Sequence, residues 1–381
     1  MLSLPAQSYH SRSLKGILLH DIPTGQLAAF IMAAILFCSL ASLLLAFLGG
    51  PAHAYGSLIV DVAPDAPRPY VLPNLKGEAV DFGGLIIRTL VSNSTSAGAL
   101  SVLGANAGPL PLSIIHSHKQ VETFYTLKGS VQVFHNANQG RELRADDFAL
   151  LAAGSNHTYR FNELDFQLSL VLAPGGVEGL FNTIGNSYRS SAPFNPEDKM
   201  QLNVTNVLEL FPRYGITPAL HNTINLDWTN GTTHDGLSTW HVTDQTLPDD
   251  AHTPYFVSSN RGPKYLQRNS GQVVQMLASG KQTDNKLTVA TVAMKPGTQP
   301  SPVHFDVHQA LQVTEGQLHL EINNEAVTLI FGDLAFIPKG TSFSYWSTVG
   351  FTKFVTWSAG AGLADSLVKG AKKWDHAVWP A

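Results

Sequence analysis

The sequence predicts an all-β protein in which one β-unit occurs twice. Several stretches alternate apolar and polar residues, and no stretch after residue 54 shows a long, capped helical period. In addition, residues 147–159 (DFALLAAGSNHTY) align without gaps with residues 333–345 (DLAFIPKGTSFSY). A period of two is typical of strands with one buried face, so we expect two similar β-domains.

The first element is an apolar run over residues 27–48, followed by residues 49–51 (GGP) and the small-x-small triplet 52–54 (AHA). This pattern is typical of a secretory signal peptide, and we expect residues 1–54 to be removed. A start at Met32 would give a signal of ordinary length. The run is also long enough to span a bilayer, so the alternative is an uncleaved signal anchor. We therefore expect a secreted, extracellular protein or, without cleavage, a membrane-anchored one.

The composition excludes some classes of function. The 381-residue chain has 24 Lys and Arg against 28 Asp and Glu, a net charge of −4, so it lacks the basic footprint of a nucleic-acid-binding protein. Cys38 is the only cysteine and lies in the signal segment, so we expect no disulfide in the folded protein. Sequons that suit a glycosylated, secreted surface begin at Asn93, Asn156, Asn203 and Asn230.

Strand-like runs follow in order along the rest of the chain: residues 123–127, 131–134, 166–172, 287–294, 317–322 and 351–357. Gly129 separates the first two runs, and Gly316 takes the same place in the second copy. Each copy is therefore expected to contain a β-hairpin with a glycine in its turn. Short helices are expected at residues 204–211 and 363–372.

The repeat divides the chain into domains. We expect an N-terminal domain at residues 55–194 and a C-terminal domain at residues 251–381. Residues 195–250 are rich in Asn, Thr, Pro and Asp and have few alternating runs, so we interpret them as a linker.

The chemistry-bearing residues lie in the first copy. His116 and His118 are separated by one residue, which on a strand places both imidazoles on one face. Glu122 follows on the next strand, and His157 follows Gly154 on a later one. Three imidazoles and a carboxylate suit a divalent transition metal with an open coordination position, one per chain.

These motifs resemble the two signature motifs of the cupin superfamily, whose fold is a small jelly-roll barrel, so the two copies indicate a bicupin. Other segments resemble the secreted fungal quercetin 2,3-dioxygenases. They are residues 57–60 (SLIV), 63–65 (APD), 68–70 (RPY), 122–129 (ETFYTLKG), 174–176 (PGG) and 262–266 (GPKYL). The resemblance runs from about residue 57 to residue 357.

The resemblance implies copper bound by His116, His118, Glu122 and His157, although iron, manganese, nickel and cobalt suit the same ligands. It implies a flavonol substrate such as quercetin, and dioxygen as co-substrate. Glu122 would act as catalytic base for the flavonol hydroxyl, and the heterocyclic ring would open with release of carbon monoxide. The positions of the family's flavonol pocket correspond to Leu103, Ala105 and Tyr159, and we expect Phe124 as a further apolar wall of the cavity.

The chain departs from the family motifs at particular positions. The interval between His118 and Glu122 is one residue shorter than in the fungal enzymes. The usual Gly and Pro of the second motif are replaced by Asp146 and Ala152, and Leu110 replaces a Gly of the first. In the second copy, Phe343 replaces the third histidine, so a degenerate metal site is expected there, with His304 and His308 outside any ligand set.

Two other functions keep the same residues. A cupin decarboxylase or dioxygenase for an organic acid would need a cation near its pocket, for which Arg88 and Arg160 are candidates. A noncatalytic cupin would bind a ligand without reaction. The sequence leaves open whether the protein is a monomer or a homodimer, and it predicts no stable membrane partner once the signal is cleaved.

Overall fold

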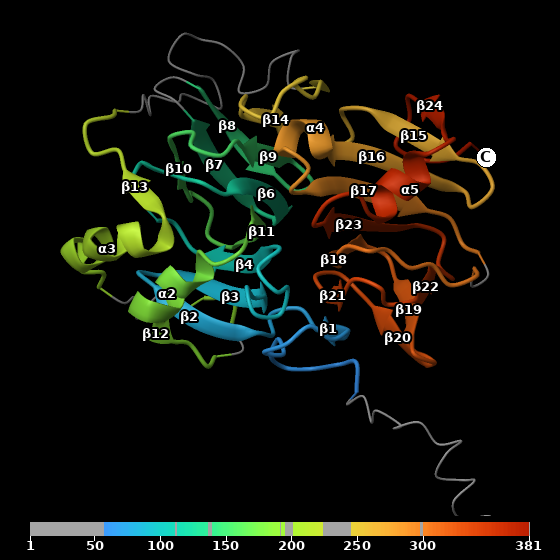
Figure 1. The fold of residues 1–381 in the computed structure, drawn as a ribbon, viewed down its shortest axis with the longest axis horizontal. Coiled ribbons are helices and arrows are strands. Elements are labelled where there is room, and N and C mark those ends of the chain that lie inside the picture. The colour runs from blue at the N-terminus through green and yellow to red at the C-terminus, as the bar shows by residue number, and fades with distance from the viewer. Residues whose placement is uncertain are drawn as a thin grey trace, which may run out of the picture. The chain divides into compact units, whose positions relative to one another are not determined.

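The computed structural model describes residues 57–110, 113–135, 139–190, 192–194, 201–223, 245–297 and 300–380 (Figure 1). The apolar run at residues 27–48, and with it the signal prediction, lies outside them. No helix in the described part of the chain is long and apolar enough to cross a membrane.

Two jelly-roll barrels of antiparallel strands make up the described residues, which confirms the all-β, bicupin prediction. The larger sheet of the N-terminal barrel contains, in spatial order, β12 (Asn186–Ser187), β2 (Glu78–Phe82), β3 (Leu85–Val91), β4 (Ser101–Ala107), β11 (Phe166–Ala173), β6 (Val121–Lys128), β9 (Phe148–Leu151) and β14 (Tyr255–Val257). Its smaller sheet contains β13 (Ile216–Pro218), β5 (His116–His118), β10 (His157–Arg160), β7 (Ser130–His135) and β8 (Gln139–Arg144).

The C-terminal barrel repeats this arrangement. Its larger sheet contains β1 (Tyr70–Leu72), β21 (Leu334–Ile337), β18 (Gln309–Glu315), β23 (Thr352–Ser358), β17 (Thr288–Met294), β16 (Gln272–Ala278), β15 (Lys264–Gln267) and β24 (Lys372–Trp374). Its smaller sheet contains β20 (Glu325–Leu329), β19 (Leu318–Ile322) and β22 (Phe343–Trp346).

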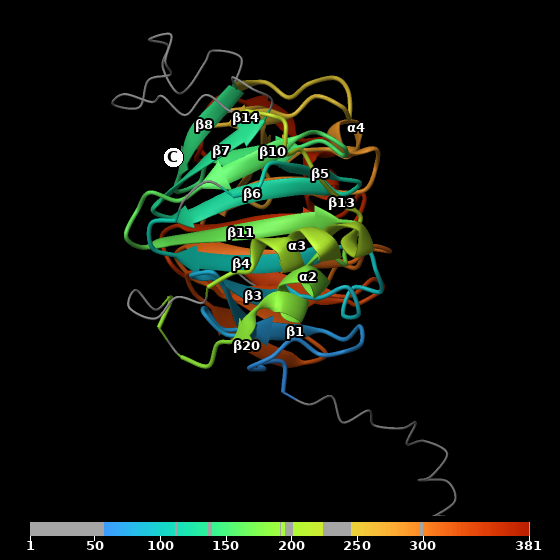
Figure 2. The same ribbon diagram turned by 90° about the vertical axis from the view of Figure 1, so that its left-hand side faces the viewer.

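Within the described residues, five short helices accompany the sheets: α2 (Glu178–Ile184), α3 (Val204–Leu210), the 3-10 helix η1 (Phe211–Tyr214), α4 (Gly280–Thr283) and α5 (Leu363–Val368). Figures 1 and 2 show α2 and α3 on the side of the N-terminal barrel that faces away from the C-terminal barrel. The helix predicted at residues 204–211 corresponds to α3, and the one predicted at 363–372 to α5.

The expected hairpins at Gly129 and Gly316 are wrong. β6 pairs with β9 and β11 in the larger sheet, whereas β7 pairs with β8 and β10 in the smaller one. The chain turns at Gly129 from one sheet to the facing sheet, and β18 and β19 do the same at Gly316. Gly129 has φ of +70°, and a Cβ placed there would lie 2.7 Å from the carbonyl oxygen of Asp165. A residue with a side chain would clash at this corner.

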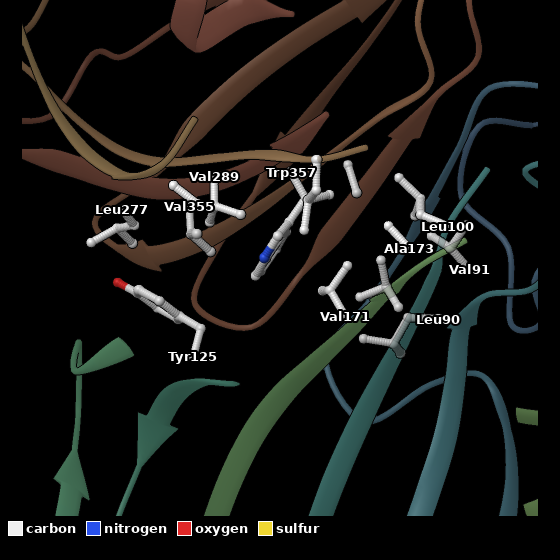
Figure 3. Close-up of a cluster of buried hydrophobic side chains, with 14 of the residues drawn as sticks. Leu90, Val91, Leu100, Tyr125, Val171, Ala173, Leu277, Val289, Val355 and Trp357 are labelled. Atoms are coloured by element: carbon white, nitrogen blue, oxygen red, sulfur yellow. The ribbon is translucent and has the colours of Figure 1, made fainter. Parts of the chain in front are cut away.

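Strand β11 shows how two apolar cores form from one sequence. All eight of its residues are buried, because both faces of the strand are covered. Phe166, Leu168 and Leu170 point into the interior of the N-terminal barrel, whereas Val171 and Ala173 join a core shared with the C-terminal barrel. Figure 3 shows side chains from both barrels meeting in this shared core.

Two strands cross the boundaries expected from the repeat. β1, near the start of the N-terminal domain, pairs with β21 of the C-terminal barrel. Conversely, β14, from the C-terminal part of the chain, pairs with β9 of the N-terminal barrel. Each barrel therefore contains one edge strand that comes from the other half of the sequence.

Candidate metal centre

The three histidines converge from two neighbouring strands of the smaller N-terminal sheet. β5 lies between β13 and β10, and His157 of β10 is paired directly with His116 of β5. The ligand nitrogens of His116, His118 and His157 all lie within 4.8 Å of one another, so this group can hold a metal ion. It is the one such group among the described residues.

Backbone carbonyls fix the protonation of two of these rings. His116 Nδ1 lies 2.8 Å from the carbonyl oxygen of Ile114, and His157 Nδ1 lies 2.9 Å from that of Ser155. A carbonyl oxygen only accepts, so Nδ1 carries the proton in both rings. In a neutral ring, Nε2 then offers a lone pair, which is the form that binds metals.

Glu122 reaches the group from the facing sheet. Its Oε2 lies 3.1 Å from His118 Nε2 and 2.9 Å from His157 Nε2. His157 Nε2 is buried and makes no aligned hydrogen bond, and buried His118 Nδ1 also has no partner. A neutral His157 thus directs a lone pair at a carboxylate oxygen, an arrangement that needs a cation or a proton between the two atoms. The donor set therefore fits a divalent transition metal.

Burial and the neighbouring charges shape the titration of the group. Burial, together with the nearby His157, lowers the pKa of His116 to about 3, so His116 is neutral near pH 7. Burial alone would raise the pKa of Glu122, but the adjacent His118 and His157 outweigh it and hold this pKa well below its usual range. Glu122 is therefore an anion.

The group lies at a cavity of about 270 Å³ inside the N-terminal barrel. Its walls are mostly aliphatic and aromatic, with Leu103, Leu170 and Leu172 contributed by the larger sheet. Leu180 and Phe181 from the α2 region also line it. Further lining comes from the supposed linker: Leu202, Val204, Val207, Phe211 and Ile216.

This linker segment was not expected to contribute to the site. Residues 201–223 form α3, η1 and β13, of which the sequence predicted the helix α3. The ring of Phe211 lies 6.0 Å from that of His116, between centroids, and β13 pairs with β5. The available signal was the apolar spacing of Val204, Val207 and Phe211, which the helix prediction used only in part.

The four expected pocket residues separate into two pairs. Leu103 and Tyr159 line the cavity. Ala105 and Phe124 are fully buried in the surrounding core and are not among its described lining residues. Burial raises the pKa of Tyr159 to about 12, and the charge of Glu122 adds to the rise while the Ser113 hydroxyl opposes it. Tyr159 is therefore a neutral phenol near pH 7.

Comparison with known proteins decides the family. The chain is 32% identical over 350 residues to quercetin 2,3-dioxygenase of Aspergillus japonicus, an alignment that covers 85% of this chain and 99% of that protein. The chain belongs to the quercetin 2,3-dioxygenase family. Quercetin 2,3-dioxygenase of Bacillus subtilis (strain 168) is 26% identical over 300 residues, which cover 77% of this chain and 82% of that relative.

Broader comparisons add little to this family assignment. No family model matches the chain. The oxalate decarboxylase of Lactobacillus farciminis, solved as a formate complex, has a TM-score of 0.48 and 12% identity and covers 79% of this chain and 88% of its own.

The corresponding region of the C-terminal barrel differs from the histidine group of the N-terminal barrel. His304 is exposed, whereas His308 is buried and stacks on Phe336 with the ring centroids 5.7 Å apart. Phe343, at the repeat position of His157, is fully buried. An apolar ring there offers no ligand atom.

The sequons differ in their surroundings. Asn93 and Asn203 are exposed, and Asn203 caps α3 by accepting hydrogen bonds from the backbone of Thr205 and Asn206. Asn156 is half-buried beside His157, and Asn230 lies outside the described residues.

Proposed function

We propose that this chain is a metal-dependent dioxygenase that opens the heterocyclic ring of a flavonol such as quercetin and releases carbon monoxide. The observation that carries the proposal is the contact between His157 Nε2 and Glu122 Oε2 at the polar end of an otherwise apolar cavity. Membership of the quercetin 2,3-dioxygenase family supports the substrate and the reaction.

The residues of this site divide the work. His116, His118 and His157 would hold the metal, with Glu122 as a further ligand. The bound metal would supply a Lewis-acid site and the redox chemistry for dioxygen. The Glu122 carboxylate lines the cavity beside the metal-binding histidines, so it is placed to accept the proton of the flavonol hydroxyl. The apolar walls would orient the ring system and exclude water.

The organic-acid alternative has less support. Arg88 is buried, but its guanidinium donates to Asn106 and to the carbonyls of Leu75, Ala192 and Pro193. Arg160 donates twice to Gln132. Neither arginine is among the cavity's described lining residues, which include no lysine or arginine. Among the residues that the structure describes, a small carboxylate would therefore find no lysine or arginine side chain at this cavity.

Three features of the protein are proposed from its sequence. The family resemblance favours copper as the native metal. The segment ending at residue 54 favours secretion after cleavage, with glycans at Asn93, Asn203 and Asn230, and the anchored form is the alternative. The protein would act as a monomer or a homodimer.

A combined measurement tests the proposed function. Metal content and quercetin consumption with carbon monoxide detection would be measured on the same secreted sample. We expect about one metal per chain and release of carbon monoxide, both lost in His157→Ala and both kept in His304→Ala, which changes an exposed histidine. Bound metal without carbon monoxide from any flavonol would overturn the proposed reaction.

A further inference from the structure

The polar side chains of the cavity fall into two groups. His116, His118 and Glu122 form the metal-binding end. Of the remaining described lining residues, Ser113 and Tyr159 are the ones whose side chains can form hydrogen bonds, and all others are apolar or glycine.

The backbone holds Ser113 and Tyr159 side by side. The Ser113 N–H donates to the Tyr159 carbonyl over 3.0 Å, and the Thr158 hydroxyl donates to the Ser113 carbonyl over 2.8 Å. Tyr159 follows His157 by two residues on β10, so both side chains face the barrel interior. The backbone hydrogen bonds and the register of β10 therefore fix the positions of Ser113 and Tyr159.

Neighbouring aromatic rings restrict the tyrosine ring. The centroid of Tyr159 lies 5.8 Å from that of Phe124 and 5.3 Å from that of Phe161. Phe124 does not line the cavity, but its contact with the Tyr159 ring helps to hold this lining residue in place. A restrained phenol can act as a directional hydrogen-bond partner at little entropic cost.

Flavonols differ in how many hydroxyls their outer rings carry. A hydroxyl that leaves water for an apolar wall loses hydrogen bonds, which lowers affinity. Conversely, a cavity hydroxyl that a ligand leaves unpaired also lowers affinity. One polar pair on apolar walls can therefore satisfy a single buried outer hydroxyl, whereas each further hydroxyl that is buried against these walls lowers the affinity of the ligand.

We infer that Ser113 and Tyr159 form a second polar anchor that binds one outer-ring hydroxyl of the substrate. This inference rests on the proposed function and deepens it, because it predicts that the cavity prefers flavonols with a hydroxyl at the anchored outer-ring position. The cavity volume of about 270 Å³ is at the lower end for ligand pockets, so it suits one ring system without an attached sugar.

Binding of flavones to the metal-free protein tests the anchor separately from catalysis. Flavones lack the hydroxyl that would face the metal. Calorimetry would compare unsubstituted flavone with monohydroxyflavones substituted on either outer ring. We expect at least one monohydroxyflavone to bind about tenfold more tightly than flavone. In Tyr159→Phe this ratio should fall to about one while the affinity for flavone is kept, and Ser113→Ala should reduce it partly.

Tyr345→Phe is the matched control, because Tyr345 occupies the repeat position of Tyr159 in the other barrel and donates to Gln272. It should leave the ratio unchanged. The anchor is refuted by an unchanged ratio in Tyr159→Phe, by equal binding of all flavones, or by no binding. Carbon monoxide release from quercetin by the metal-loaded wild type reports separately on the proposed function.

Discussion

At the scale of single residues, the site depends on hydrogen-bond acceptors that face one another with no proton between them. His157 Nε2 and Glu122 Oε2 are both acceptors in the state that the backbone carbonyl of Ser155 favours, and they lie 2.9 Å apart. A bound cation would turn this unfavourable contact into a favourable one. In the proposed reaction, the same carboxylate accepts the proton of the flavonol hydroxyl.

Glu122→Gln separates these two roles. The amide keeps an oxygen but loses the negative charge and the ability to accept a proton as a base. We expect metal content to stay near that of the wild type while quercetin turnover falls by roughly 10²-fold or more. Asp306→Asn, at an exposed acid of the second barrel, should change neither quantity. Full turnover in Glu122→Gln would remove this residue as the base.

Asp147 makes stability depend on pH. Its carboxylate is buried and accepts hydrogen bonds from the N–H groups of Arg144 and Ser259, yet burial raises its pKa to about 6. A carboxyl whose pKa is higher in the folded state contributes stability below the unfolded pKa near 4, and this contribution is lost as pH rises through about 6.

Asp147→Asn tests the sign of this effect. The free energy of unfolding of the wild type, relative to the variant, should fall by up to about 3 kcal/mol between pH 4 and pH 7. Urea unfolding of both proteins across this range gives the difference, in which the other titrating groups cancel. A relative stability that rises with pH would contradict the raised pKa.

The sequence predicted the polar end of the site better than its walls. His116, His118, Glu122 and His157 are brought together, because their strand spacing already restricts which faces they share. Ala105 and Phe124 lie behind the lining, since period-two alternation indicates an inward face but not the depth of a side chain. Ser113 shows no periodic signal, because it lies outside the named strands.

At the scale of elements, the six runs of alternating residues located six strands of the described part of the chain, namely β6, β7, β11, β17, β19 and β23, but did not show which strands pair. The chain turns at Gly129 into the facing sheet, and neither strand's pattern distinguishes this corner from a hairpin. Asp146 stands where the motif was expected to have a glycine, and it adopts φ of +70°. Its carboxylate accepts hydrogen bonds from Tyr125 and Lys353, contacts that a glycine could not make.

Gly129→Ala tests the corner. The added methyl would meet the backbone of Asp165 and Phe166, and the left-handed conformation would be strained as well. Gly154→Ala is the matched control, since Gly154 has φ of +81° but a methyl added there would meet no atom within 4 Å. We expect a loss of about 1 kcal/mol for Gly154→Ala and a clearly larger loss for Gly129→Ala, measured by urea unfolding. Equal losses would mean that the corner relaxes freely.

At the scale of the whole molecule, the barrels share strands and a core. β1 completes a sheet of the C-terminal barrel, and β14 completes a sheet of the N-terminal barrel. The sequence repeat could not show this exchange, because both edge strands lie outside the aligned segments. Tyr125 of one barrel meets Trp357 of the other edge to face, with the ring centroids 6.2 Å apart (Figure 3). Ser169 also donates to Gln312 across the same interface over 2.6 Å.

This sharing predicts that both barrels unfold in one transition. Four of the six tryptophans lie in the sequence of the C-terminal barrel, so their fluorescence reports mainly on that half, while release of bound metal reports on the N-terminal site. The two urea curves should coincide.

Trp357→Ala removes a fully buried ring from the shared core, so we expect it to lower the free energy of unfolding by about 3–5 kcal/mol. Because the core belongs to both barrels, the urea midpoints of tryptophan fluorescence and of metal release should fall together in this variant. If the midpoint of metal release stayed at its wild-type value, the N-terminal barrel would be stable without its partner.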